Sequence, residues 1–239
     1  MAQTVSRWLR SRENKRLKRC SLNTLLTTEF FRDPLRRLYY NRNMFLSPAD
    51  GIILYAYPRV GATEKIVEVK GRNFTVQDLL FDKTYTKDSL VIGIFMSLLD
   101  VHINRMPTNG YIAEVVETPS IMTHNTSMFN LEQQLFNQTR FNPDNLMYLF
   151  ENERMISTVR CPEIHGEYYV VQIADKDVNA IINYGEGDYF QQGERFGSIR
   201  WGSQVDIVIP LTGNIEYEIL VKPFTHVQGC IDKLVKIVK

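Results

Sequence analysis

Two Gly-Ser steps lie five residues apart in the sequence, Gly197-Ser198 and Gly202-Ser203. The second leads directly into VDIVIP, an apolar alternation that is typical of a strand. A serine hydroxyl becomes a nucleophile when a base takes its proton and donors stabilise the oxyanion that forms. Glycine before the serine permits backbone conformations that other residues resist. Taken alone, the commoner interpretation of this step is a glycine turn at the start of a strand.

A histidine with polar neighbours follows the apolar run 91–99. If that strand continues, Asp100, His102 and Asn104 share one face, because side chains alternate with a period of two. A histidine beside carboxylate and amide groups can be tuned as an acid or a base near neutral pH. The commoner alternative for such a stretch is a hydrogen-bonded histidine at a strand end.

Two shorter motifs also place charged residues beside apolar stretches. Asp50 lies in SPADG, where the alternative role is a turn aspartate that hydrogen-bonds its own backbone. Asn152, Glu153 and Arg154 precede a short apolar alternation, and the alternative there is a charged turn. None of these motifs is specific on its own.

The elements that must position these residues are mostly short β-like runs. Segments rich in Val, Ile and Tyr and bounded by Gly, Pro, Asn and Asp predict strands at 51–57, 65–70, 89–96, 110–117, 154–161, 167–174, 205–210 and 215–222. Residues 73–82 are expected to form a short helix, and residues 124–147 a loop with one helical turn. We therefore predict the α+β class, with a mainly antiparallel β body at 44–239.

The first 43 residues are predicted to form a basic helical segment ahead of that body. Apolar residues have helical spacing at positions 5, 8 and 9, and again at 31, 35 and 38. Residues 1–42 contain eleven basic and three acidic residues, whereas the other 197 contain 17 basic and 24 acidic ones. A basic arm on an acidic body indicates an anionic partner for the arm.

The overall composition, 44% apolar and 23% charged over 239 residues, is that of an ordinary globular protein. The longest apolar run, 91–99, is far shorter than the ~20 residues of a membrane-spanning helix. Cys20, Cys161 and Cys230 lack metal-like spacing and are expected to be reduced cysteines of a cytosolic protein. No phosphate-binding loop or dinucleotide fingerprint is present, and neither a nucleotide nor a metal cofactor is expected.

In their order along the chain, SPADG, DVHINRMPTNG, NERMIS and GERFGSIRWGSQVDIVIP resemble the phosphatidylserine decarboxylase family. The similarity covers about residues 44–235 and is to the shorter, soluble form, which lacks a long membrane-inserted N-terminal region. It implies a self-processing decarboxylase that converts phosphatidylserine to phosphatidylethanolamine with release of CO₂. The backbone would break between Gly202 and Ser203, and Ser203 would become a pyruvoyl group, the electron sink of the reaction. Gly197-Ser198 would be an ordinary turn.

The same resemblance implies roles for individual residues. Asp50 matches the processing aspartate, Ser203 the nucleophile, and His102 a histidine that transfers a proton during decarboxylation. Arg105 is a departure, because larger bacterial members have a processing histidine there, and arginine is a poor base. Three explanations stay open: His102 serves both steps, Asp50 acts without that histidine, or processing is slow or absent. We favour His102 acting with Asp50.

Substrate binding is expected to involve three further residues. The planar guanidinium of Arg105 suits a carboxylate or a phosphate, and Asn104 lies next to it in the motif. His124, in the polar loop near position 120, is the third candidate.

A phospholipid substrate suits the basic arm, because each basic residue near an anionic membrane contributes about 1 kcal/mol to binding. We therefore expect a cytoplasmic protein that is peripheral on the membrane. The alternatives are a solvated helix, or a helix that docks on the body or on a second subunit in a homo-oligomer. Nucleic acid is not an expected partner, because the body is acidic and no nucleic-acid module is present. Two other functions also stay open: the same chemistry on a soluble amino acid or related metabolite, and a non-catalytic β binding module.

Overall fold

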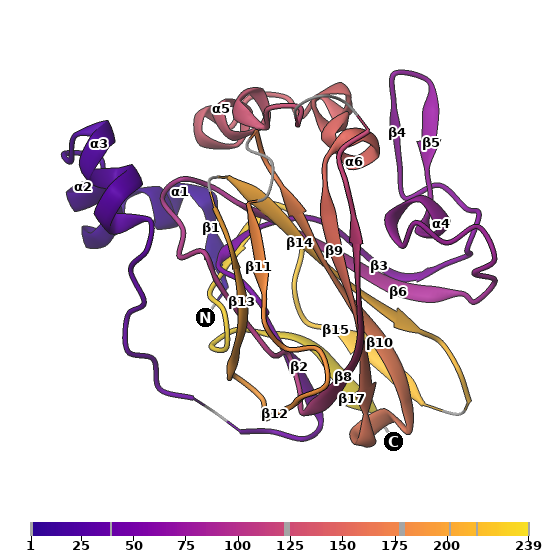
Figure 1. Cartoon of the computed structure of the whole chain (residues 1–239). Coiled ribbons are helices and arrows are strands. Elements are labelled where there is room, and N and C mark those ends of the chain that lie inside the picture. The colour runs from indigo at the N-terminus through magenta and orange to yellow at the C-terminus, as the bar shows by residue number, and fades with distance from the viewer. Residues whose placement is uncertain are drawn as a thin grey trace.

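The computed structural model describes residues 2–38, 40–121, 125–176, 180–200, 202–213 and 215–238. Within these ranges, nine strands form one antiparallel sheet at the centre of the molecule (Figure 1). In spatial order they are β1 (Gln3–Thr4), β16 (Thr225–Val227), β3 (Gly51–Val60), β6 (Ser89–Met96), β14 (Ser203–Pro210), β10 (Gly166–Ala174), β9 (Arg154–Cys161), β8 (Gly110–Thr118) and β12 (Tyr189–Phe190). The predicted α+β class with a mainly antiparallel body is confirmed.

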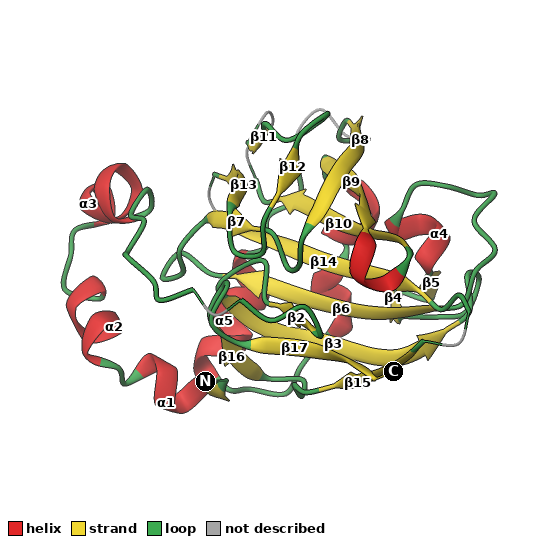
Figure 2. Cartoon of the chain, turned by 90° about the horizontal axis from the view of Figure 1, so that it is seen from below, coloured by secondary structure: helices red, strands yellow, loops and turns green. Residues whose placement is uncertain are grey.

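The central strands β6 and β14 are buried along their whole length, which explains their nearly continuous apolar sequences. One face of the sheet packs against helices and a hairpin: α4 (Val76–Leu79), α5 (Phe129–Asn137), α6 (Tyr148–Glu151), and β4 (Val67–Val69) with β5 (Arg72–Phe74). The other face packs against two small sheets, β15 (Glu216–Ile219), β17 (Lys233–Val238) and β2 (Met44–Leu46), and β11 (Ile181–Asn183), β13 (Arg195–Ile199) and β7 (Ile103–Arg105). Figure 2 shows β3, β6 and β14 side by side between these layers.

The N-terminal segment is helical only in short pieces: α1 (Val5–Leu9), α2 (Arg12–Leu17), α3 (Leu22–Thr24) and a π-helical turn at Leu25–Glu29. The side chains of Thr4, Ser11 and Ser21 cap the three α-helices. Because serine and threonine favour caps over helix interiors, they divide the segment into separate turns. A single basic helix is therefore not observed.

The second predicted helical stretch, at positions 31–38, is wrong. The chain has no helix there, and Leu35 is fully exposed. Pro34 disfavours the helical conformation of the residue before it, and the chain runs extended along the body instead. At its other end the segment is fixed to the main sheet, because β1 pairs with β16.

Two further expectations also need correction. The polar stretch 124–147 contains α5, whose buried Leu131 and Leu135 are one helical turn apart. The strand at 89–96 does not continue to residue 104, because β6 ends at Met96 and a turn separates it from β7. No helix among the described residues is long and apolar enough to cross a membrane.

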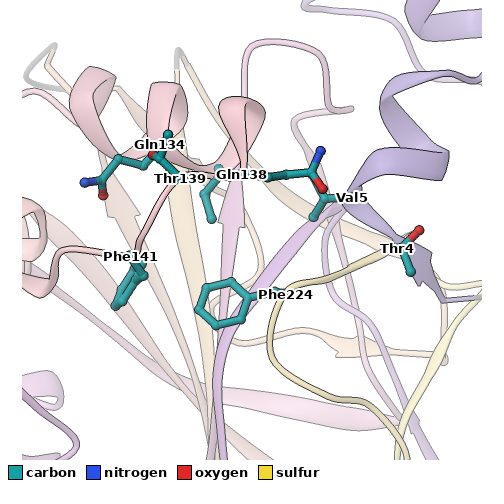
Figure 3. A pocket seen from close by; sticks show the side chains of 8 residues that line it. Thr4, Val5, Gln134, Gln138, Thr139, Phe141 and Phe224 are labelled. Atoms are coloured by element: carbon teal, nitrogen blue, oxygen red, sulfur yellow. The ribbon is translucent and has the colours of Figure 1, made fainter.

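Figure 3 shows the contact between the N-terminal segment and α5. A cavity of about 300 Å³ lies there, lined by Thr4 and Val5 of the N-terminal segment and by Gln134 and Gln138 at the end of α5, with the Gln138 side chain beside Val5. The rings of Phe141 and Phe224 lie 5.5 Å apart at its lower edge. The N-terminal segment therefore forms part of the molecular surface around the helical layer.

Candidate functional site

The sequence motifs meet at one end of the central sheet. Ser203, the first residue of β14, pairs with Met96 at the end of β6 and with Ala174 at the end of β10. β3 starts at Gly51 and β9 at Arg154 on the same end, because neighbouring strands run in opposite directions. Asp50, the 97–105 segment, Asn152 and the Gly202-Ser203 step are thus brought to one edge.

The Ser203 side chain is fully buried. Its Oγ donates to Sδ of Met96 at 3.3 Å, and Nδ2 of Asn104 approaches the same sulfur at 3.7 Å. Asn104 is held in turn, because its Oδ1 accepts from Gln172 Nε2 at 2.7 Å. The structure therefore brings Asn104 next to Ser203. In this state the hydroxyl faces a weak sulfur acceptor rather than a base.

Gly202 has a carboxylate beside it. A Cβ atom at this position would lie 2.7 Å from Oδ2 of Asp175, so only glycine fits without a shift. The other oxygen of Asp175 accepts from the backbone N–H of Met128 at 2.6 Å, which holds the carboxylate in place. Sequence reasoning missed Asp175, which lies outside every motif that was recognised.

A cavity of about 270 Å³ opens next to Gly202. Its walls combine apolar side chains with two acids and one base: Phe95, Leu98, Met128, Phe129, Ser127, Glu132, Asp175 and Lys176. The Glu132 carboxylate accepts from the backbone N–H of Leu98 at 2.8 Å. Burial raises the pKa of Glu132 to about 7. The mixed lining suits a ligand with a charged head and an apolar body.

His102 lies in the turn between β6 and β7 and is buried. Its Nδ1 lies 3.0 Å from the backbone oxygen of Asp100, an acceptor, so Nδ1 carries the proton. Nε2 is buried without a hydrogen-bond partner among the described residues. Burial lowers the pKa of His102 to about 4, so the ring is neutral at pH 7. The His102 side chain therefore contacts the backbone oxygen of Asp100, and the two side chains do not share a strand face as expected.

Asp50 is engaged by a residue from the N-terminal segment. Arg36 donates to both carboxylate oxygens, at 2.5 Å and 2.7 Å, and Gly229 N–H donates at 2.7 Å. Both side chains are almost completely buried. Asp50 thus lies at the same end of the sheet as Ser203, and its oxygens accept hydrogen bonds from Arg36 and Gly229 in this state.

The rest of the 30–36 segment contacts the other motif residues. The Phe30 ring stacks on His102 with 3.9 Å between centroids. Arg32 donates to the backbone oxygen of Leu99 at 2.6 Å. The Asp33 carboxylate accepts from Nη2 of Arg105 at 2.7 Å, and Arg105 is buried. Sequence reasoning did not place these N-terminal residues at the site.

The Asn152-Glu153-Arg154 motif supports the site rather than forming a charged turn. Asn152 Nδ2 donates to the oxygen of Ala174 at 2.7 Å, and its Oδ1 accepts from Thr126 N–H at 2.6 Å. Glu153 accepts from the backbone N–H of residue 180 at 2.8 Å. The buried Arg154 guanidinium donates to backbone carbonyls of α4 and α6. Together they fix the strand end that pairs with Ser203.

The other Gly-Ser step is not the turn that was expected. Gly197 and Ser198 lie inside β13, where they pair with β11 on one side and β7 on the other. A Cβ at Gly197 would lie 2.5 Å from the backbone oxygen of Ile182, so glycine permits close strand approach. His124, the remaining predicted residue, lies outside the described residues.

His226 was given no role from sequence, yet it is buried at the same end of the sheet. Its Nε2 lies 2.7 Å from Oδ1 of Asp100. The Trp8 ring stacks on it with centroids 4.1 Å apart. The sequence pattern gives no sign of these contacts, because Asp100 and Trp8 lie far from His226 along the chain.

Comparison with known proteins places this geometry in a family. A family model described as phosphatidylserine decarboxylase matches residues 23–230. The phosphatidylserine decarboxylase proenzyme of Wolbachia pipientis wMel is 34% identical over 192 residues, covering 80% of this chain and 68% of the relative. The proenzyme of Ralstonia pickettii (strain 12J) is 32% identical over 191 residues, covering 79% and 70%. That of Ehrlichia chaffeensis (strain ATCC CRL-10679 / Arkansas) is 29% identical over 201 residues, covering 82% and 70%. On these matches, the chain belongs to the phosphatidylserine decarboxylase family.

Proposed function

We propose that this protein is a decarboxylase that cleaves its own chain between Gly202 and Ser203 and converts phosphatidylserine to phosphatidylethanolamine with release of CO₂. The observation that carries the proposal is the position of Ser203. It starts a central, fully buried strand, next to a glycine, at the edge where the other family motifs meet. The relatives are named proenzymes, which is consistent with cleavage.

The surroundings of Ser203 fit a pyruvoyl group made from it. The position is buried, the neighbouring Gly202 lines a cavity of about 270 Å³, and no bulky side chain occupies position 202. Such a group would supply a ketone carbonyl that withdraws the electrons left behind when CO₂ departs. Strand β14 pairs on both sides with strands of the preceding part of the chain. The fragments 1–202 and 203–239 would therefore stay together after cleavage.

Proton transfer is assigned to His102. Its Nδ1–H is donated to Asp100, so the lone pair is on the buried Nε2, where a proton can be accepted and returned. We further propose that His102 and Asp50 together support the cleavage step, in place of the histidine that larger relatives have at position 105. For Asp50 to act directly, Arg36 must release at least one of its oxygens.

The substrate is proposed to enter the cavity beside Gly202. Its apolar walls suit the acyl chains of a lipid, and Lys176 at its rim suits a phosphate or carboxylate. Asn104, next to Ser203, Arg105 and His124 stay proposed binding residues. Arg105 becomes available to an anion only if Asp33 leaves it.

The N-terminal segment is proposed to bring the protein to the cytoplasmic membrane surface. The exposed basic residues of α2 and the turn that follows it, including Arg12, Lys15 and Arg19, face solvent and suit anionic lipids. Binding of the segment to a membrane and its docking on the β body are compatible, because the exposed basic residues would contact the lipid while other residues of the segment contact the body. A second subunit in a homo-oligomer could also use this exposed surface.

The decisive experiment is the intact mass of the purified protein, with turnover of phosphatidylserine in detergent micelles. The wild type is expected to give fragments 1–202 and 203–239 and to release CO₂ from the lipid. Ser203→Ala is expected to stay uncut and inactive, whereas Ser198→Ala, at the other Gly-Ser step, should be cut normally. An uncut wild-type chain, or turnover by Ser203→Ala, would contradict the proposal. Release of CO₂ from free serine but not from the lipid would instead favour a soluble substrate.

A further inference from the structure

His226 and Asp100 form a buried contact that the proposed reaction does not use. His226 lies in β16, between β1 and β3, and its side chain and that of Asp100 are each 1% exposed. The distance from His226 Nε2 to Asp100 Oδ1 is 2.7 Å. Because an ionised carboxylate only accepts hydrogen bonds, Nε2 carries the donated proton. Nδ1 of the same ring is buried without a partner among the described residues.

Asp100 joins His226 to the turn that carries His102. Its Oδ2 accepts from both the N–H and the Oγ of Ser97, at 2.9 Å and 2.7 Å, which closes the turn after β6. Its backbone oxygen receives Nδ1–H of His102 at 3.0 Å. Although burial raises the pKa of Asp100, the neighbouring His226 and the Ser97 donors lower it overall. The carboxylate is therefore a fixed acceptor, and its backbone carbonyl is fixed with it.

A residue of the N-terminal segment, Trp8, covers one face of the His226 ring. Trp8 is buried and stacks on His226 at an interplanar angle of 14°. Trp8 also packs on Phe136 of α5, with 5.9 Å between centroids. A ring stacked on a packed tryptophan has little freedom to rotate away from its acceptor.

We propose that His226 is a positioning residue for His102, acting through Asp100, and that Trp8 fixes it in that role. Losing the His226 donor loosens the 97–100 turn and its carbonyl, and His102 then no longer has a single tautomer. The inference rests on the proposed role of His102 in proton transfer. It gives the N-terminal segment a part in the chemistry that is separate from membrane binding.

Two substitutions of His226 separate the effect of its hydrogen bond to Asp100 from the effect of its stacking on Trp8. His226→Gln keeps an N–H donor near the position of Nε2 but loses the aromatic ring. His226→Phe keeps a ring against Trp8 but has no donor. His165→Asn is the matched control, because His165 is exposed in the β9–β10 hairpin at the other end of the sheet, with a φ of 47° that asparagine tolerates.

The first measurement does not depend on cleavage or activity. The chain has four histidines, so ¹⁵N labelling of histidine rings in the Ser203→Ala background gives a simple spectrum. The parent and the His226→Gln and His165→Asn chains are expected to show His102 as the Nδ1–H tautomer alone. His226→Phe is expected to show a mixture of tautomers. A folded His226→Phe chain with an unchanged His102 signal would overturn the proposal.

The second measurement uses the full, cleavable chain. For His226→Phe we expect kcat for phosphatidylserine to fall about tenfold or more, a cost of about 1.4 kcal/mol, with KM nearly unchanged. His226→Gln should recover most of the loss. If His226→Phe does not fold, Trp8→Leu tests the same link by removing the stack on His226 together with the ring contact with Phe136, and an unchanged His102 tautomer and kcat there would equally overturn it. If the wild type is itself uncut and inactive, the proposed function fails, and the tautomer result still decides the role of His226.

Discussion

Arg36 donates one hydrogen bond to each carboxylate oxygen of Asp50, so the N-terminal segment reaches into the proposed processing site. The same segment places Phe30 on His102 and Asp33 on Arg105. Three of the residues that the family motifs single out are therefore contacted by residues 30–36, which precede those motifs but lie within the 23–230 stretch that the family model matches. The N-terminal segment is part of the site as well as a candidate membrane arm.

Replacing Arg36 is expected to destabilise the protein. Arg36→Gln leaves the Asp50 carboxylate buried without its charged partner, and breaking a buried ion pair in this way typically costs about 3–5 kcal/mol. Chemical denaturation of the Ser203→Ala chain, which is expected to stay uncut, measures the change. Arg12→Gln, which removes an exposed arginine of the same segment, should cost less than about 0.5 kcal/mol. Equal effects of the two substitutions would show that the Asp50 contact contributes nothing.

Gly202→Ala is expected to slow self-cleavage because of a clash with one carboxylate. The added Cβ would lie 2.7 Å from Asp175 Oδ2, whose carboxylate is held through Oδ1 by the Met128 N–H, and would push the scissile peptide away from its position. Mass spectrometry over time gives the rate of fragment formation. If the clash is the cause, adding Asp175→Ala should restore part of the lost rate, as a double-mutant cycle detects. Additive losses in the double variant would refute the steric explanation.

Acid is expected to destabilise the fold through His102. Burial lowers its pKa from 6.5 to about 4, so below pH 6.5 the unfolded chain binds a proton that the folded chain excludes. The stability contribution is present at neutral pH and is lost as the pH falls from about 6.5 to about 4, by roughly 3 kcal/mol in total. Chemical denaturation of the Ser203→Ala chain at several pH values, with and without His102→Gln, isolates the contribution of His102 to the pH dependence of the free energy of unfolding. The stability difference between the two chains should change with pH across this window.

Glu132 is expected to have the opposite pH dependence. Burial raises its pKa from 4.5 to about 7, so the folded chain holds a proton that the unfolded chain has released. Stability is lost as the pH rises through this window, by roughly 3 kcal/mol in total. Glu132→Gln keeps the acceptor for Leu98 N–H and has no charge to bury, so it should become more stable than wild type as the pH increases from 5 to 8. A constant difference would mean that Glu132 is ionised throughout.

The strands were predictable where one local pattern decides them. β6 has the predicted bounds because its continuous apolar run requires burial, and β9 because its apolar residues recur between polar ones, as in a strand. α5 was missed because its Asn and Gln residues conceal the Leu131–Leu135 spacing. The stretch at 31–38 has helical spacing, but Pro34 and its contacts with the body favour an extended chain.

Only those residues of the candidate site that lie in recognisable motifs could be predicted from the sequence. Ser203, His102 and Asp50 lie in short patterns, and the register of the sheet brings them to one edge. His226 meets Asp100 across 126 positions of sequence, and Arg105 meets Asp33 across 72. Such contacts depend on how the elements pack in three dimensions, and no local spacing indicates them.

Membrane binding is expected to depend on the exposed basic residues of the N-terminal segment, independently of cleavage. Arg12, Lys15 and Arg19 face solvent, and replacing all three with glutamine should weaken binding to phosphatidylserine-containing vesicles by ~100-fold, at ~1 kcal/mol for each. Vesicle co-sedimentation of the Ser203→Ala chain measures the affinity, with phosphatidylcholine vesicles as the uncharged reference. The control removes the same charge from the body, at Lys87, Lys222 and Lys233, which are also exposed. If both triple variants lose affinity equally, net charge rather than the segment is responsible. If neither does, the segment serves the site and the fold but not the membrane.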